Sequence, residues 1–338
     1  MRGAIIYGSR DVRFEERSDP TIVEPTDAIV RAVAACVCGS DLWRYRGIQE
    51  VSQPTPIGHE YVGIVEAVGQ DVTTVRPGQF VVGGFLTSDN TCPVCRAGMH
   101  SNCLNVTGYD GCQAELIRVR NADGTLVATP ERPDDAMVPS ILALSDVMCT
   151  GWHAAVSANV RPGNSVVVVG DGAVGLSGVL AAAELGAERI IAMSRHADRQ
   201  ALAKDFGATD IISARGDEGV EAVKELTTGI GADAVLECVG TDESVDQALK
   251  SARPGAMVGW VGVPHFTELP QPHMFWKNVG LRGGPAPARA YLPDLLDRVL
   301  SGRIQPGKVF DLTLPLDQVA EGYAAMDERR AIKTLLIP

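Results

Sequence analysis

Residues 165–175 read SVVVVGDGAVG. The run of valines predicts a buried strand, and the Ala- and Leu-rich residues after the turn predict a helix. The glycine spacing G-x-G-x-x-G allows a tight turn and lets the backbone approach a pyrophosphate at the positive end of that helix. Because the motif lies between a strand and a helix, it predicts a dinucleotide site. The residues of this site are Gly170, Gly172, Ala173, Val174 and Gly175.

Strands and helices alternate on the C-terminal side of this turn. RIIAM (189–193) is followed by a helix over 197–206, TDII (209–212) by a helix near 218–227, and ADAVLECVG (232–240) by a helix near 243–251. This alternation predicts a parallel sheet with right-handed crossovers. On the N-terminal side, residues 1–145 are rich in Gly, Pro and short β-branched runs, which predict an irregular all-β unit.

Length and charge narrow the classes of protein. A chain of 338 residues with 45% hydrophobic residues supplies two cores. We expect neither a signal peptide nor a membrane span, because no run reaches about eighteen apolar residues. The net charge of −12 disfavours nucleic acid as a partner. Eight cysteines without an export signal indicate a reducing, cytoplasmic setting in which clustered cysteines bind metal.

The strand that follows the glycine turn predicts which dinucleotide binds. NAD sites end this strand with an acid that accepts hydrogen bonds from the ribose hydroxyls. Here Ser194 takes that position, followed by Arg195 and, one helical turn later, Arg199. A hydroxyl and two guanidiniums suit a 2′-phosphate, so we predict NADP(H) in preference to NAD(H). The alternative is a solvated basic helix start.

A cysteine-rich loop gives the first candidate metal site. Cys92 and Cys95 form a C-x-x-C turn, and Cys103 follows in the same loop. Zinc takes four ligands in a closed structural site. Asp89 would complete the set, and His100 is the rival fourth ligand. Three cysteines in one short loop favour a structural zinc site over three free thiols.

The second candidate site is dispersed along the chain. Its members are Cys38 in VCGSD, His59 and Glu60 in IGHEYVG, and Asp146 in LSDVMCTGWH. Spacing alone does not establish a site here. A buried cysteine and a hydrogen-bonded core histidine are the default interpretations of the separate pieces.

Together these motifs carry a resemblance that covers essentially the whole chain. The VCGSD, GHE, cysteine-loop, Asp146–Gly151 and GDGAVG segments occur in the order typical of zinc-dependent medium-chain alcohol dehydrogenases. The resemblance implies an α/β protein with a GroES-like β domain over 1–147 and 283–338. A Rossmann doubly wound parallel-sheet domain would occupy 148–282. The use of Asp at 146 is similar to the bacterial secondary-alcohol branch.

The resemblance also implies roles for single residues. Cys38, His59 and Asp146 look like the catalytic zinc ligands. Glu60 resembles the acid beside the ligand histidine. Ser40 matches the hydroxyl that contacts the substrate oxygen and starts proton release.

Further roles concern the cofactor. Thr150 matches the residue beside the nicotinamide, and Lys333 matches a basic position that contacts the pyrophosphate in relatives. The carboxamide is expected to meet the backbone of Val261, Gly262 and Val263.

Two positions depart from the family pattern. Asp89 replaces the first cysteine of the cysteine-rich loop, which we call the lobe and which holds the structural zinc in the family. Trp43 stands where many relatives have a relay histidine, so the proton must leave by another route from Ser40.

These features predict an enzyme that moves a hydride between NADP(H) and a small alcohol or carbonyl substrate. Zinc would polarise the substrate oxygen, and the family implies a homodimer or homotetramer. The alternatives are a zinc-free NADPH quinone or enone reductase of the same superfamily and a non-enzymatic zinc-binding module. The set Cys38, His59 and Asp146 argues against the first, and the glycine motif and the acidic charge argue against the second.

Overall fold

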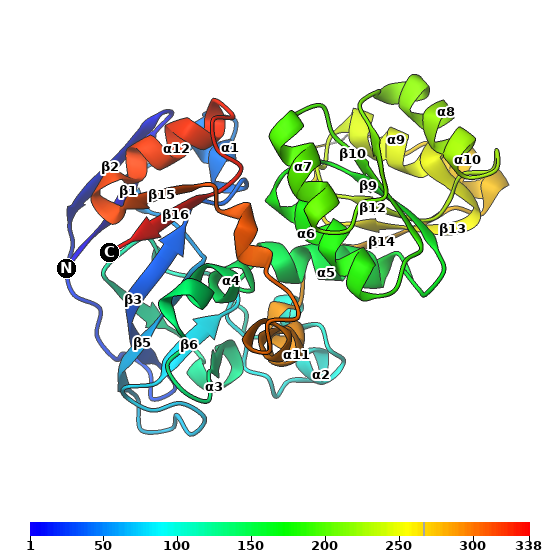
Figure 1. The fold of residues 1–338 in the computed structure, drawn as a ribbon. Helices are drawn as coiled ribbons and strands as arrows, with labels where there is room; N and C mark the ends of the chain where they lie inside the picture. Colours follow the sequence, from blue (N-terminus) through cyan, green and yellow to red (C-terminus); the bar gives the residue numbers. More distant parts are fainter. Residues whose placement is uncertain (266–267) are drawn as a thin grey trace. The chain divides into compact units, whose positions relative to one another are not determined.

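The computed structural model describes residues 1–265 and 268–338, which form two compact units (Figure 1). Unit 1 comprises Met1–Cys149 and Pro287–Pro338, and unit 2 comprises Thr150–Ala286. The sequence places the corresponding boundaries at 147/148 and 282/283. No helix among the described residues is both long enough and apolar enough to cross a membrane.

Unit 2 is a six-stranded sheet in the order β11-β10-β9-β12-β13-β14, and every neighbouring pair is parallel. This is the doubly wound order 3-2-1-4-5-6, so the predicted α/β fold is confirmed. The strands are β9 (Ser165–Val169), β10 (Arg189–Met193), β11 (Asp210–Ile212), β12 (Ala232–Glu237), β13 (Ala252–Trp260) and β14 (Gly280–Gly283). The helices are α6 (Ala173–Glu184), α7 (Ala197–Asp205), α8 (Gly216–Leu226), α9 (Asp242–Ser251) and α10 (Gln271–Lys277).

The central strands of unit 2 are apolar on both faces because helices flank the sheet on both sides (Figure 1). Val167, Ile191, Val235 and Val258 are fully buried in one cluster. Burying such side chains contributes roughly 1.5–3 kcal/mol each. The sheet is therefore a rigid support for the loops at the carboxyl ends of its strands.

Unit 1 holds a three-stranded sheet, β2-β1-β4, and a larger sheet, β15-β16-β3-β5-β6-β8, with β7 paired to β3. All pairs are antiparallel except β15 with β16. The strands are β1 (Arg2–Gly8), β2 (Asp11–Glu16), β3 (Ala28–Cys36), β4 (Thr55–Pro56), β5 (Tyr61–Val68), β6 (Phe80–Gly83), β7 (Leu116–Val119), β8 (Leu126–Ala128), β15 (Leu312–Pro315) and β16 (Thr334–Ile337). The α-helices are α1 (Asp41–Tyr45), α2 (Pro93–Arg96), α3 (Ala122–Thr125), α4 (Val138–Ala143), α11 (Ala288–Leu300), α12 (Val319–Asp327) and α5 (Val147–Ser157), which continues into unit 2.

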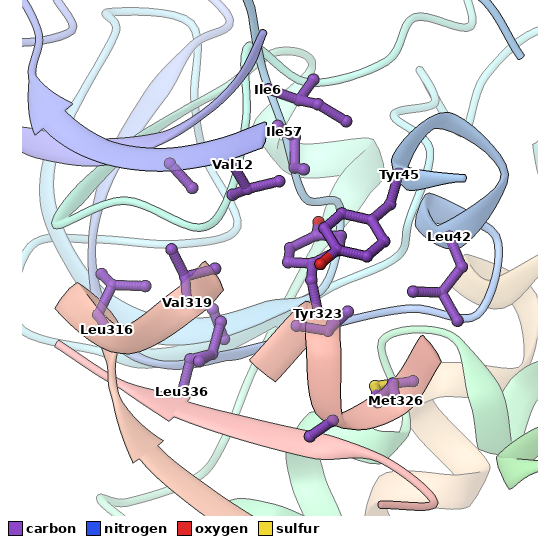
Figure 2. Packing of buried hydrophobic residues seen from close by; sticks show 14 of the residues in the cluster. Ile6, Val12, Leu42, Tyr45, Ile57, Leu316, Val319, Tyr323, Met326 and Leu336 are labelled. Atoms are coloured by element: carbon purple, nitrogen blue, oxygen red, sulfur yellow. The ribbon is translucent and has the colours of Figure 1, made fainter. Parts of the chain in front are cut away.

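One core of unit 1 joins the first strands to the C-terminal segment (Figure 2). Tyr45 at the end of α1 packs on Tyr323 of α12, with ring centroids 5.4 Å apart. Leu42 is buried in the same cluster. This packing fixes α1, and therefore the loop before it, against the end of the chain.

Candidate active site and cofactor turn

Four side chains from three segments that are distant in sequence meet in unit 1. The ligand atoms of Cys38, His59, Glu60 and Asp146 all lie within 4.8 Å of one another. The Asp146 Oδ2 atom is 3.5 Å from the Cys38 sulfur and 3.3 Å from His59 Nε2. Cys38 follows β3, His59 and Glu60 precede β5, and Asp146 precedes α5. The fold thus brings together the whole set that the resemblance implies.

The electrostatics of this cluster fit a bound cation. Burial and the nearby Asp146 and Glu60 carboxylates raise the pKa of the Cys38 thiol. Burial also raises the pKa of Glu60, and its Oε2 atom has no hydrogen-bond partner among the described residues. A thiol, an imidazole and a carboxylate are ligands that Zn²⁺ accepts. A divalent ion would offset the crowded negative charge, so these residues fit zinc.

A neighbouring carboxylate holds His59 from the other side. Asp41 Oδ1 lies 3.4 Å from His59 Nδ1, while Asp41 Oδ2 accepts hydrogen bonds from the Cys38 amide at 3.2 Å and from the Tyr323 hydroxyl at 3.3 Å. Burial alone would lower the pKa of His59, but the charges of Asp41 and Cys38 outweigh it and raise that pKa. Such a partner orients a ligand histidine. The sequence analysis did not assign Asp41 the role of orienting His59, although Asp41 is the last residue of the VCGSD motif.

The cysteine loop forms a second cluster. The ligand atoms of Asp89, Cys92, Cys95 and Cys103 lie within 4.8 Å of one another. Cys92 precedes α2, and its sulfur accepts the Cys95 amide at 3.4 Å. The Cys103 sulfur accepts the Asp89 amide at 3.3 Å. Backbone amides directed at the Cys92 sulfur lower the pKa of that thiol, which favours the thiolate form that binds zinc.

The glycine turn between β9 and α6 leaves room for a phosphate. Gly170 has φ of +117°, and a Cβ at Gly175 would lie 1.9 Å from the Gly170 oxygen. Neither position tolerates a side chain. A Cβ at Gly172 would meet nothing within 4 Å. That open space next to the start of α6 is what a pyrophosphate needs.

A carboxylate from the glycine turn, that of Asp171, contacts the residue after β10, and the sequence analysis assigned it no role. The Ser194 hydroxyl donates to Asp171 Oδ2 at 2.7 Å, and Arg199 Nη1 lies 3.2 Å from Asp171 Oδ1. Arg195 is exposed. Two of the three residues predicted to hold a 2′-phosphate therefore already have an acidic partner.

Family models match both parts of the chain. The alcohol dehydrogenase GroES-like domain matches residues 24–131, and the zinc-binding dehydrogenase model matches residues 173–301. A probable zinc-binding alcohol dehydrogenase of Mycobacterium tuberculosis is 35% identical over 97% of this chain and 86% of its own length. The chain belongs to the zinc-dependent medium-chain alcohol dehydrogenase family.

Other members of the family are similarly related. An alcohol dehydrogenase structure from Thermus sp. ATN1 superposes with a TM-score of 0.91 at 34% identity and covers 100% of this chain and 99% of its own. An NADP-dependent isopropanol dehydrogenase of Clostridium beijerinckii is 31% identical over 97% of this chain and 95% of its own length. The predicted family and its oxidoreductase class are therefore confirmed.

Lys333 of this alcohol dehydrogenase has a buried partner that the sequence analysis did not foresee. Its ammonium donates to Glu60 Oε1 at 2.7 Å and to the Val37 carbonyl at 3.1 Å. The Lys333 side chain is 1% exposed and that of Glu60 is 0% exposed. This pairing was not foreseen from the sequence, and the pyrophosphate contact of Lys333 stays a prediction. In the described structure Lys333 compensates the charge of Glu60.

The structure of the cysteine loop, residues 89–103, distinguishes between Asp89 and His100 as the fourth ligand. Asp89 lies in the cluster, whereas His100 is outside it and contacts Asn90 Oδ1 at 2.7 Å. Asp89 Oδ1 also accepts the Thr91 amide at 2.8 Å and the Cys92 amide at 2.9 Å. Hydrogen bonds of this kind outweigh burial and lower the pKa of Asp89. Asp89 is thus held as a carboxylate.

The remaining predicted residues occupy several elements. Ser40 is the N-cap of α1, and its hydroxyl donates to the Cys38 sulfur at 3.2 Å. Thr150 is buried in α5. The Val261 and Gly262 amides donate to the Glu237 carbonyl at 2.9 and 3.2 Å. These two amides are therefore committed within unit 2, and a carboxamide would have to use other backbone groups of this segment.

Proposed function

We propose that this alcohol dehydrogenase interconverts an alcohol and the corresponding ketone or aldehyde with NADP(H) as hydride partner, using zinc held by Cys38, His59 and Asp146. The observation that carries the proposal is the convergence of these ligand atoms within 4.8 Å from three separate segments. Three protein ligands are the number typical of catalytic zinc sites. A zinc-free reductase would have no need of this set.

When bound, zinc supplies Lewis-acid polarisation of the substrate oxygen and the nicotinamide supplies hydride chemistry. The protein holds the reacting groups in place. Asp41 fixes the ring of His59, and Lys333 offsets the charge of the buried Glu60 beside the cluster and counteracts the rise that burial causes in its pKa. Neither residue has to contact the substrate to act in this way.

The Ser40 hydroxyl is the first proton-transferring group in this proposal. It lies 3.2 Å from the Cys38 sulfur, which places it at the edge of the ligand set. A hydroxyl both donates and accepts a hydrogen bond, so it suits a group that passes on the substrate proton. Trp43 has only an N–H donor and cannot relay that proton. We assign Thr150 to the nicotinamide side on family resemblance alone.

The preference for NADP(H) rests on the end of β10. Ser194 stands where NAD sites carry an acid, and the exposed Arg195 offers a guanidinium for a 2′-phosphate. The relative from Clostridium beijerinckii is named as NADP-dependent. We assign the pyrophosphate to the turn at Gly170, Gly172 and Gly175.

A second zinc ion is proposed for the cysteine loop. Asp89, Cys92, Cys95 and Cys103 provide four ligands, the number that closes a structural site. The ion would tie the loop together without taking part in the reaction.

A homo-oligomer, dimer or tetramer, is also proposed. Among the described residues β14 pairs only with β13, so one edge of the sheet is open. Phe275 and Trp276 on the neighbouring α10 are 72% and 78% exposed. Size-exclusion chromatography with light scattering should give at least twice the 35.8 kDa chain mass. A monomer would refute the proposed oligomer but not the proposed enzymatic activity.

The test of the proposed function is a side-by-side fluorescence titration with NADPH and NADH, with zinc assayed on the same sample. We expect about two zinc ions per chain and tighter binding of NADPH. Activity is then measured with a panel of primary and secondary alcohols. Reduction of the cofactor is followed by the absorbance of the reduced nicotinamide at 340 nm. Absence of zinc, or of binding by either cofactor, would refute the proposal.

A further inference from the structure

The acid at the end of β10 comes from a different loop. Asp171 lies between Gly170 and Gly172 in the glycine turn, and its carboxylate reaches Ser194, the first residue after β10. Arg199 of α7 contacts both the carboxylate, at 3.2 Å, and the Asp171 carbonyl oxygen, at 3.3 Å. The side chains of Asp171 and Arg199 are 12% and 15% exposed. The pair is therefore held in place and shielded from water.

We propose that Asp171 is a cofactor-specificity residue. It supplies, from the glycine turn, the carboxylate that NAD sites place at the end of the second strand. Its carboxylate therefore accepts hydrogen bonds from the ribose hydroxyls of NAD(H). The same carboxylate limits the preference for NADP(H). This inference rests on the proposed nicotinamide-dependent function and deepens it, because it makes the chain tolerant of both cofactors.

The charges around Asp171 support this role. Arg199 is paired with the carboxylate, so its charge is largely compensated before a cofactor arrives. Ser194 is 1% exposed, and its hydroxyl donates a hydrogen bond to Asp171. Arg195 is the cation in this group with no side-chain partner among the described residues. A 2′-phosphate, with a charge of about −1.5 to −2, would gain Arg195 but meet the carboxylate.

A carboxylate near a phosphate is unfavourable in a partly buried site because charges are poorly screened there. A ribose hydroxyl, in contrast, donates to a carboxylate. The same side chain therefore acts in opposite directions on the two cofactors. This opposition distinguishes a specificity role from a purely structural one.

The experiment compares Asp171→Asn with Asp198→Asn in the full-length, zinc-loaded protein. The two changes remove the same charge, but Asp198 is an exposed residue of the first turn of α7 whose side chain makes no hydrogen bond or ion pair in the described part of the chain. Fluorescence titration gives Kd for NADPH and for NADH. We expect Asp171→Asn to tighten NADPH binding and weaken NADH binding, and to shift their ratio by about tenfold or more. Asp198→Asn should change the ratio less than about twofold.

A second pair of variants keeps the test decisive if Asp171→Asn is poorly folded. Arg195→Met should weaken NADPH binding about tenfold more than Arg199→Met, because only Arg195 is uncommitted. Equal losses for the two arginine variants would overturn the inference.

The two failures can be told apart. If wild-type protein binds both cofactors but Asp171→Asn weakens NADPH at least as much as NADH, Asp171 merely positions Arg199. The inference is then wrong and the proposed function stands. If wild-type protein binds neither cofactor, the proposed function itself fails.

Discussion

The two ligand clusters of unit 1 are built in opposite ways. The members of the dispersed cluster span Cys38 to Asp146 and reach their places through strands of the same folded unit. The members of the lobe lie within residues 89–103. Both sets converge within the same 4.8 Å limit. The dispersed cluster is therefore a product of the fold, whereas the lobe is a local loop that a metal ion would hold together.

The environments of the two clusters differ accordingly. The dispersed cluster is supported by buried side chains from the C-terminal segment, Lys333 and Tyr323. The lobe is supported by its own backbone amides. Changes to the dispersed cluster should therefore affect both chemistry and stability, and changes to the lobe should remain local.

The largest effect is expected from Cys38→Ser. Loss of this thiolate removes a ligand from the dispersed cluster, so metal analysis should find about one zinc ion per chain instead of two. We expect kcat/KM to fall by about 10³-fold or more, since zinc contributes several kcal/mol to the transition state. Cys112→Ala is the matched control, because Cys112 is buried in unit 1 outside both clusters. Full activity in Cys38→Ser would show that this cluster does not hold the catalytic metal.

Lys333→Met should destabilise the fold. It leaves the fully buried Glu60 without its cation, and removing one partner of such a pair costs about 3–5 kcal/mol of unfolding free energy. The pKa of Glu60, already raised by burial, should rise further, because Lys333 holds it down. A raised carboxyl pKa costs stability above the unfolded pKa, so the loss should be larger at pH 8 than at pH 5. Urea unfolding at both values measures it.

The double variant Glu60→Gln with Lys333→Met is the control for this change. It removes both charges, so it should recover part of the lost stability at pH 8. A single variant Lys333→Met as stable as wild type would indicate that the dispersed cluster does not depend on its buried support.

A smaller effect is expected from Asp41→Asn. The amide holds His59 less firmly than the carboxylate, so zinc affinity of the dispersed cluster should fall about 10–100-fold. Competition with a graded chelator measures this affinity without relying on activity. Tyr323→Phe removes a neutral donor to Asp41 and to Gln113 Oε1, and should have an effect of less than about tenfold. Equal effects of the two variants would assign the support of His59 to packing instead of charge.

The sequence predicted the parts of this molecule that depend on neighbouring residues. The SVVVVGDGAVG motif gave β9, the turn and α6, and the C-x-x-C spacing gave the lobe. The dispersed cluster required a family resemblance, because nothing in the spacing of Cys38, His59 and Asp146 indicates that they meet. The strand order confirmed here fixes which loops lie together, and that information is absent from any single segment.

The misses have one physical cause. The pairs Lys333–Glu60, Asp41–His59 and Asp171–Ser194 each join segments that the sequence separates. Lys333 was predicted to contact the pyrophosphate on family resemblance, and that resemblance did not indicate Glu60 as its partner. Its burial is visible only once β16 pairs with β3 and brings it against Glu60. Side-chain partners across a fold are thus the hardest feature to predict from sequence.

The smallest effect is expected from Asp89→Asn in the lobe. The amide oxygen can still accept the Thr91 and Cys92 amides, so the local turn should persist. The substitution removes the carboxylate charge, and the zinc affinity of the lobe should fall about tenfold. Because the change remains local, kcat/KM should stay within about twofold of wild type. Zinc titration with activity measured on the same samples checks both values. Parallel loss of activity and lobe zinc would mean that the lobe supports the dispersed cluster, and the contrast between the two would not hold.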